Sequence, residues 1–155
     1  MVTTLREEIK QTKPFASLEQ EAHLSLVRTG ALLFDEVEKF LKPYGITATQ
    51  YNVLRILRGA EPNGLCRNEL RDRMLTRMPD MTRLLDRLED ADLVGRERQD
   101  HDRRLVRSRI TSAGLKLLAD LDDVVRAEEK RRLSHLNDEQ LGTLIDLLAL
   151  VRSGN

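Results

Sequence analysis

The chain has 155 residues, of which 40% are hydrophobic and 34% are charged. This length is typical of one domain, and the apolar fraction is sufficient for a packed core, so the composition excludes a multidomain assembly and a disordered chain. Only five residues are aromatic, which favours helices over a β-rich fold. The chain shows no signal peptide, no apolar stretch long enough to cross a membrane and no cysteine pair, and we expect a cytoplasmic protein.

The charges are balanced overall and uneven locally. Lys plus Arg and Asp plus Glu each number 26, yet residues 94–109 hold six Arg against three acidic residues. Residues 65–109 contain twelve Arg and no Lys. Arginine suits bidentate contacts with phosphate and guanine, although the same usage can reflect a GC-rich genome, and the count alone favours neither interpretation.

The first half of the chain predicts three helices. Ser17 and Gln20 have the spacing of a capping box, and Pro43 disfavours helical geometry in the residue before it, so we expect a helix over 17–42. A second capping box at Thr47 and Gln50 starts a helix that continues to Gly59. After a turn at 61–64, a short third helix is expected over about 66–74.

The second half predicts a helix, a hairpin and two further helices. Met81, Leu84, Leu85 and Leu88 follow the i, i+3, i+4, i+7 pattern of an amphipathic helix, which ends near Asp92 as a left-handed cap. Alternating runs at 94–99 and 104–110 then predict a β-hairpin. A helix opens at 111–114, and the last helix follows a capping box at 137–140. This last helix is apolar nearly all round, and we expect it to meet another subunit.

Three short helices followed by an arginine-rich hairpin form the winged variant of the helix-turn-helix, whose second helix enters the major groove of DNA. The expected fold class is therefore mainly α with a small β-hairpin. The polar face of the fourth helix would in isolation be interpreted as a solvated surface, but the hairpin directly after it favours DNA reading.

The residues resemble the MarR family of bacterial transcription regulators over about 31–119. The resemblance is strongest in TRLLDRLE at 82–89, in DHDRR at 100–104 and in ITSAG at 110–114. It implies a winged lobe over about 45–110 and dimerisation helices over about 17–42 and 111–152. It also implies a homodimeric regulator, which we expect to be a repressor. Such a regulator binds a pseudo-palindromic operator and is released from it by a small molecule or an oxidant.

The resemblance places candidate residues in three groups. On the recognition helix the base and phosphate contacts are Asp80, Thr82, Arg83 and Arg87. On the wing the DNA contacts are Arg103, Arg104 and Arg107, with Asp102 holding the loop rather than touching DNA. At the dimer interface we expect Leu141, Leu144, Ile145, Leu148 and Val151.

The sequence says less about the effector that releases the DNA than about the DNA interface. The family's small ligands bind between the dimer helices and the winged lobe, which here implies Phe34, Tyr44, Tyr51 and the 115–121 face, although such apolar residues more often form core than a pocket. Cys66 is either an oxidant sensor or a buried thiol. The three histidines are scattered, so we expect no metal, and nothing indicates a cofactor.

Two other functional classes compete with a regulator. The sequence contains no nucleophile elbow, P-loop or dinucleotide fingerprint, so we do not expect an enzyme. The other rival is a helical dimer whose arginine hairpin binds an acidic protein partner. Sequence-selective, salt-dependent binding to duplex DNA would separate it from a regulator.

Overall fold

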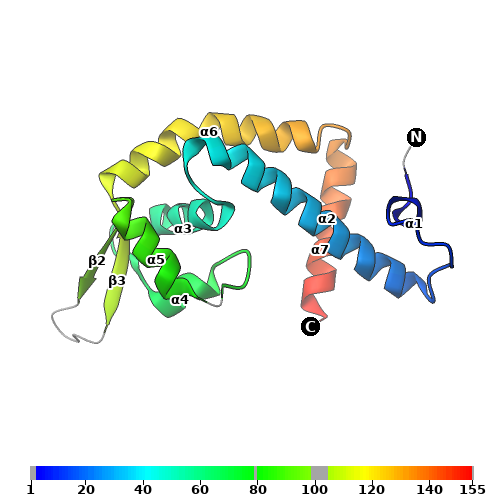
Figure 1. The fold of residues 1–155 in the computed structure, drawn as a ribbon, viewed down its shortest axis with the longest axis horizontal. Coiled ribbons are helices and arrows are strands. Elements are labelled where there is room, and N and C mark those ends of the chain that lie inside the picture. Colours follow the sequence, from blue (N-terminus) through cyan, green and yellow to red (C-terminus); the bar gives the residue numbers. More distant parts are fainter. Residues whose placement is uncertain (1–2, 79, 99–104, 155) are drawn as a thin grey trace.

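The computed structural model describes residues 3–78, 80–98 and 105–154 of the chain. Its elements in chain order are α1 (Leu5–Glu8), α2 (Leu18–Leu41), the 3-10 helix η1 (Lys42–Tyr44), α3 (Ala48–Gly59), β1 (Leu65–Cys66), α4 (Arg67–Asp72), α5 (Met81–Asp90), β2 (Val94–Arg98), β3 (Val106–Ile110), α6 (Ser112–Arg132) and α7 (Asp138–Ser153). Figure 1 shows α3, α4, α5 and the strands grouped at one end. The long helices α2 and α6 lead from this lobe to the opposite end, where α1 and α7 lie. The predicted fold class, mainly α with a small sheet, is confirmed.

The predicted helix starts are confirmed by their caps. The side chains of Ser17, Thr47, Thr111 and Asn137 each accept a hydrogen bond from the backbone N–H three residues later. These bonds satisfy donors that the first turn of a helix otherwise leaves unpaired. Asp92 has a φ of 57°, so the predicted left-handed cap after α5 is also confirmed.

The sheet has one strand more than the sequence predicted. Its order is β1-β3-β2, and Leu65 and Cys66 pair antiparallel with Ser108 and Arg107. Cys66 is therefore extended, and α4 begins at Arg67 and ends before the predicted limit of 74. A two-residue strand is too short to show an alternating pattern, and only its partner strand defines it.

The remaining differences are at the amino-terminal side. Helix α1 was not predicted; Thr4 and Glu7 form its capping box. Helix α2 ends at Leu41, and Lys42, the last residue of the predicted 17–42 helix, begins η1, in which Pro43 occupies one of the first positions. A proline cannot donate the i to i−4 hydrogen bond that an α-helix would need there.

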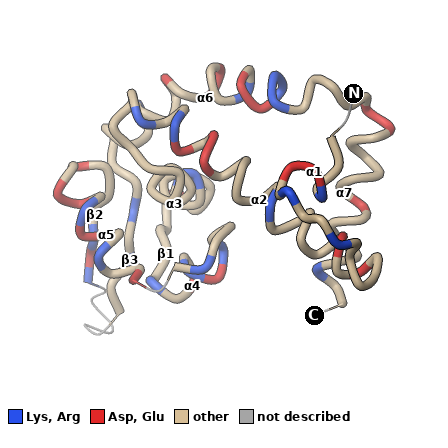
Figure 2. The backbone as a smooth tube through the Cα atoms, turned by 45° about the vertical axis from the view of Figure 1, so that its right-hand side comes forward, with Lys and Arg blue, Asp and Glu red and all other residues tan. Residues whose placement is uncertain are grey.

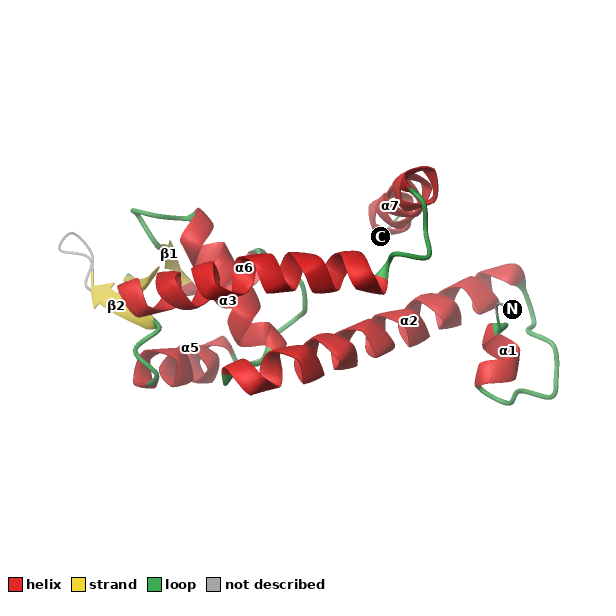
Figure 3. Ribbon diagram, turned by 90° about the horizontal axis from the view of Figure 1, so that it is seen from above, coloured by secondary structure: helices red, strands yellow, loops and turns green. Residues whose placement is uncertain are grey.

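One apolar core joins the winged lobe to α6. The buried face of α5 packs against α3 and the sheet, and the cluster consists of Val53, Leu54, Leu57, Leu65, Leu70, Met81, Leu84, Leu85, Leu88, Val94, Ile110 and Leu118. A smaller cluster of Leu41, Ile46 and Leu121 joins the end of α2 to α6. The lobe is thus held on the first half of α6, and Figure 3 shows the second half of α6 alongside α2.

Polar contacts reinforce both junctions. Arg58 on α3 donates two hydrogen bonds to the Asp122 carboxylate on α6, at 2.9 and 3.0 Å. These bonds hold the pKa of Asp122 below its ordinary value of 3.8. Farther along α6, the Arg132 side chain is 8% exposed and lies 3.3 Å from the Glu36 carboxylate of α2. Its guanidinium also lies 5.7 Å from the ring centre of Phe40.

We predict that Asp122→Asn lowers the free energy of unfolding by about 1 kcal/mol at pH 7, a figure reduced for solvent screening because the pair is about one third exposed. Since the folded state lowers the pKa of Asp122, its contribution is fully present above pH about 4 and is lost as the pH falls further. Urea unfolding at pH 7 and pH 3 measures this. An equal difference between the two proteins at both pH values would contradict the assignment.

Candidate nucleic-acid interface

Helix α5 presents a polar face because its apolar face is buried. Met81, Leu84, Leu85 and Leu88 occupy one side and are at most 7% exposed. The intervening residues therefore point outward, and the predicted recognition residues Thr82, Arg83 and Arg87 are all exposed. A helix with two arginines one turn apart on its free face has the form that enters a DNA major groove.

Asp80 has a structural role at the start of this helix. Its carboxylate accepts a hydrogen bond from the Arg83 N–H at 3.0 Å, which is the N-cap interaction of α5. A carboxylate at this position also interacts favourably with the helix dipole. The sequence grouped Asp80 with the base and phosphate contacts, whereas its side chain is engaged with the helix itself.

Helix α4 contributes a second charged edge, which was not among the residues predicted from the sequence. Arg67 donates a hydrogen bond to the Thr82 hydroxyl of α5 at 3.1 Å. The corner between the two helices encloses a cavity of about 250 Å³ lined by Arg67, Arg71, Met78, Asp80, Met81 and Thr82. The count of twelve arginines indicated a basic surface, but only the crossing of α4 and α5 brings Arg67 to Thr82.

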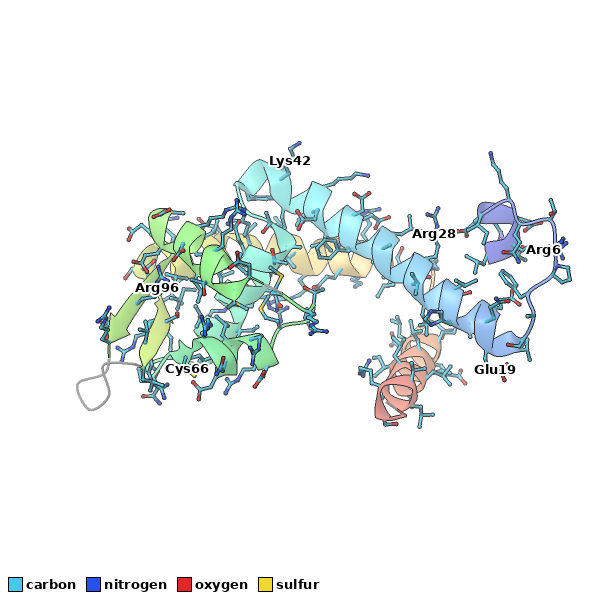
Figure 4. All side chains as sticks on the ribbon, turned by 60° about the horizontal axis from the view of Figure 1, so that its bottom comes forward. Arg6, Glu19, Arg28, Lys42, Cys66 and Arg96 are labelled. Carbon is cyan, nitrogen blue, oxygen red and sulfur yellow. The ribbon has the colours of Figure 1, made fainter. Side chains whose placement is uncertain are left out.

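Arg96 joins the wing to the recognition helix. Its guanidinium donates hydrogen bonds to the carboxylates of Glu89 and Asp86, the latter at 2.6 Å. Both bonds raise the pKa of Arg96, and the bond to Glu89 has the larger effect. Figure 4 labels Arg96 on β2 beside α5. The single positive charge of Arg96 partly offsets two acidic groups of α5 that repel phosphate. No pattern in the sequence indicates this role of Arg96, because β2 and α5 meet only in the tertiary structure.

The wing residues fall into two sets. Arg107 donates a hydrogen bond to the Gly64 carbonyl at 3.0 Å and lies 3.8 Å from Glu69, so its guanidinium braces the β1–α4 corner. A DNA contact through Arg107 stays a prediction. Asp102, Arg103 and Arg104 lie outside the described residues.

The charge pattern of the lobe is mixed rather than uniformly basic. Figure 2 shows Lys and Arg positions on α4, α5 and the wing strands, with acidic positions among them. Several of these acids are paired: Arg109 lies 3.8 Å from Glu97 across the hairpin. At Glu69, the hydrogen bond from the Cys66 N–H lowers the pKa of the carboxyl. Most acidic side chains near the arginines of the lobe are therefore already engaged in ion pairs or hydrogen bonds.

A cavity of about 280 Å³ lies between the long helices and the lobe. It is lined by Gly30, Leu33, Phe34, Val37, Ala48, Thr49, Tyr51, Asn52, Arg55, Leu75, Thr76 and Glu129. Phe34 and Tyr51 of the predicted pocket thus meet here. Tyr44 is absent from the lining, and its ring pairs with Phe40 at 5.9 Å. The 115–121 face supplies core instead, because Leu118 and Leu121 are fully buried.

Helix α7 has an exposed apolar surface. Within the described residues none of its side chains is buried, and the most exposed apolar ones are Leu150 at 67% and Ile145 at 63%. Of the predicted dimer residues, Leu144 and Val151 are also exposed, while Leu141 and Leu148 are partly covered. Leu147 and Leu150 belong to the same exposed surface, although the prediction did not include them. Side chains of this kind normally find a partner.

Neither a metal centre nor a membrane span is visible in the described part of the chain. Among those residues, no three His, Cys, Asp or Glu side chains are grouped as metal ligands would be. None of the helices described is long and apolar enough to cross a membrane. Cys66 is a free, partly buried cysteine on the α4 side of the lobe, as Figure 4 shows.

Comparison with known proteins gives a consistent family. The sequence model of the MarR family matches residues 44–105. The HTH-type transcriptional repressor Rv2887 of Mycobacterium tuberculosis is 33% identical over 115 residues, which cover 74% of this chain and 81% of that protein. The chain belongs to the MarR family of DNA-binding transcriptional regulators.

Solved structures agree with this assignment. The crystal structure of a MarR transcription factor from Planctomyces limnophilus is 43% identical, with a TM-score of 0.68, and the alignment covers 88% of this chain and 99% of that one. The Staphylococcus aureus MepR–DNA complex shares the fold, with a TM-score of 0.77 at 22% identity, over 86% of this chain and 97% of that chain.

We predict that Arg96→Gln lowers the free energy of unfolding by about 1 kcal/mol, because Asp86 and Glu89 lose a shared partner on a partly buried guanidinium. Urea denaturation followed by circular dichroism measures the change. The control is Arg109→Gln, which removes the same charge from a longer, exposed pair and should change stability by less than about 0.5 kcal/mol. Equal effects of the two substitutions would show that Arg96 has no special connecting role.

Proposed function

We propose that this regulator binds double-stranded DNA sequence-specifically as a homodimer and represses transcription from a pseudo-palindromic operator. The observation that carries the proposal is the exposed polar face of α5, with Thr82, Arg83 and Arg87 outward and the opposite face buried. In a winged helix-turn-helix this face reads base edges in the major groove. A regulator of this kind acts on the chromosome in the cytoplasm and needs no catalytic group.

Helix α5 and the wing contact different grooves of the DNA. Arg83 and Arg87 supply the base and phosphate contacts in the major groove, while Arg103 and Arg104 reach the neighbouring minor groove, where a guanidinium meets the most negative potential. Phosphate contacts set the affinity and its dependence on salt, and base contacts set the sequence preference.

Dimerisation is supported by the apolar side chains that one chain leaves exposed. They lie on α7 and on α2, where Leu26 and Leu33 are 38% and 39% exposed. A second copy would cover both surfaces, because identical chains related by a two-fold axis present the same patch to each other. Two lobes placed in this way fit two half-sites of a palindrome.

The cavity between α2, α3 and α6 is the proposed effector site. Its wall includes Leu75 and Thr76, which belong to the segment that connects α4 to α5. The Leu75 N–H donates a hydrogen bond to the Asn52 side chain at 2.9 Å, so this segment is tied to α3. A small, largely apolar ligand that displaces Leu75 would shift the start of the recognition helix. Oxidation of Cys66 would be a separate route to the same release.

We predict that Arg83→Ala combined with Arg87→Ala weakens binding to an operator selected from randomised duplexes by at least about tenfold, since each good base contact is worth roughly 1 to 3 kcal/mol. Fluorescence anisotropy at two salt concentrations measures it, and the affinity should depend less steeply on salt if either arginine binds a phosphate. As a control, Arg126→Ala removes an exposed charge on α6 and should leave affinity unchanged. If the protein binds no duplex sequence more tightly than another, the result favours the alternative in which the arginine hairpin binds an acidic protein partner.

We predict that Ile145→Asp combined with Leu150→Asp yields monomers, because two carboxylates would be buried without partners in the interface. Light scattering coupled to size-exclusion chromatography measures the mass. Both side chains are exposed in the single chain, so the fold should persist. The control Asp146→Lys changes an exposed polar position of the same helix and should remain dimeric. A double variant that keeps the dimer mass would remove α7 from the interface.

A further inference from the structure

The hydrogen bond between Arg67 and Thr82 connects the first helix of the helix-turn-helix to the second. Arg67 is the first residue of α4, and its Nη1 lies 3.1 Å from the Thr82 hydroxyl oxygen. Both side chains are exposed on the surface that the proposed function assigns to DNA. Their pairing affects the chemistry that Thr82 offers.

The backbone immediately before Arg67 is anchored by strand pairing and by two hydrogen bonds. Leu65 and Cys66 directly before it are paired with β3. The Glu69 carboxylate accepts the Cys66 N–H at 2.8 Å, and Arg107 holds the Gly64 carbonyl. A side chain rising from such a fixed point loses less freedom when it forms a hydrogen bond than one on a loop would.

The direction of the hydrogen bond determines what Thr82 can offer to DNA. A hydroxyl has one hydrogen to donate and two lone pairs to accept with, whereas a guanidinium has donors only. Because Arg67 donates to the oxygen, the hydroxyl hydrogen must point away from Arg67. One of the two lone pairs is thereby occupied, and the positive guanidinium beside the oxygen strengthens Thr82 as a donor and weakens it as an acceptor of a second hydrogen bond.

We infer that Arg67 is a positioning residue that makes Thr82 a hydrogen-bond donor, so that Thr82 selects a base presenting an acceptor in the major groove and disfavours cytosine. Guanine offers N7 and O6, adenine N7 and thymine O4, whereas cytosine offers only the N4 donor. The inference rests on the proposed function, because it requires α5 to lie in the major groove.

Arg71 provides a matched comparison. It lies one turn later on α4 and lines the same cavity at the α4–α5 corner. Its Nε lies 3.7 Å from the carboxylate of the adjacent Asp72, and its side chain is 53% exposed. Replacing Arg71 removes the same charge from the same helix while leaving the bond to Thr82 in place.

The experiment is selection of operators from a randomised duplex pool by the full-length chain, its Arg67→Ala, Arg71→Ala and Thr82→Val variants and the Arg67→Ala/Thr82→Val double variant. Circular dichroism and thermal melting confirm that each protein is folded. Thr82→Val should lose the preference for an acceptor base at one position of each half-site. Arg67→Ala should reduce that preference about fivefold, the ratio that corresponds to one net hydrogen bond of ~1 kcal/mol.

The remaining variants separate positioning from charge. Arg71→Ala should weaken binding evenly and leave the base preference intact, and adding Arg67→Ala to Thr82→Val should change no further base. Equal, sequence-independent losses for Arg67→Ala and Arg71→Ala would overturn the inference and leave Arg67 as a phosphate contact. A Thr82→Val profile identical to the original would overturn it as well. If the unmodified chain enriches no sequence in the selection, that result would instead overturn the proposed function itself.

Discussion

Burial of one face of α5 is the constraint on which the rest of the structure depends. Met81, Leu84, Leu85 and Leu88 pack against α3 and the sheet, and together they seal the core of the lobe. Each such side chain gains roughly 1.5 to 3 kcal/mol by leaving water. The helix cannot rotate without exposing them, and the outward direction of Arg83 and Arg87 is therefore a consequence of core packing.

Polar contacts then adjust what this face presents. Asp80 caps α5, Arg67 reaches Thr82, and Arg96 occupies Asp86 and Glu89. Each contact removes or redirects a charge or hydroxyl next to the arginines. A helix that carries three acidic residues and two arginines can in this way offer a surface suited to phosphate and base edges. Pairing with Arg96 reduces the negative potential of Asp86 and Glu89 beside Arg83 and Arg87, which favours a nucleic-acid partner at this face although the chain has no net charge.

The long helices connect this surface to the rest of the chain. Arg58 with Asp122 and Arg132 with Glu36 link α6 to α3 and α2, so the lobe and the proposed dimer helices are not independent bodies. The cavity at Phe34 and Tyr51 lies at this junction. A ligand there would contact α2, the lobe and the segment before α5 at once, so its binding would depend on how these three parts are arranged.

The sequence by itself determined most of the elements and the outward face of α5, because capping boxes and a 3.6-residue apolar period are local signals. The caps at Ser17, Thr47 and Asn137 and the left-handed Asp92 were all predictable. Only the tertiary structure decided the contacts between elements. Strand β1 has two residues and exists through its pairing with β3, and Tyr44 and Tyr51 separate into different surroundings although both are aromatic and close in sequence. The sequence does not distinguish the roles of Arg67, Arg96 and Arg107. Their roles differ because each side chain contacts a different partner in the packed structure.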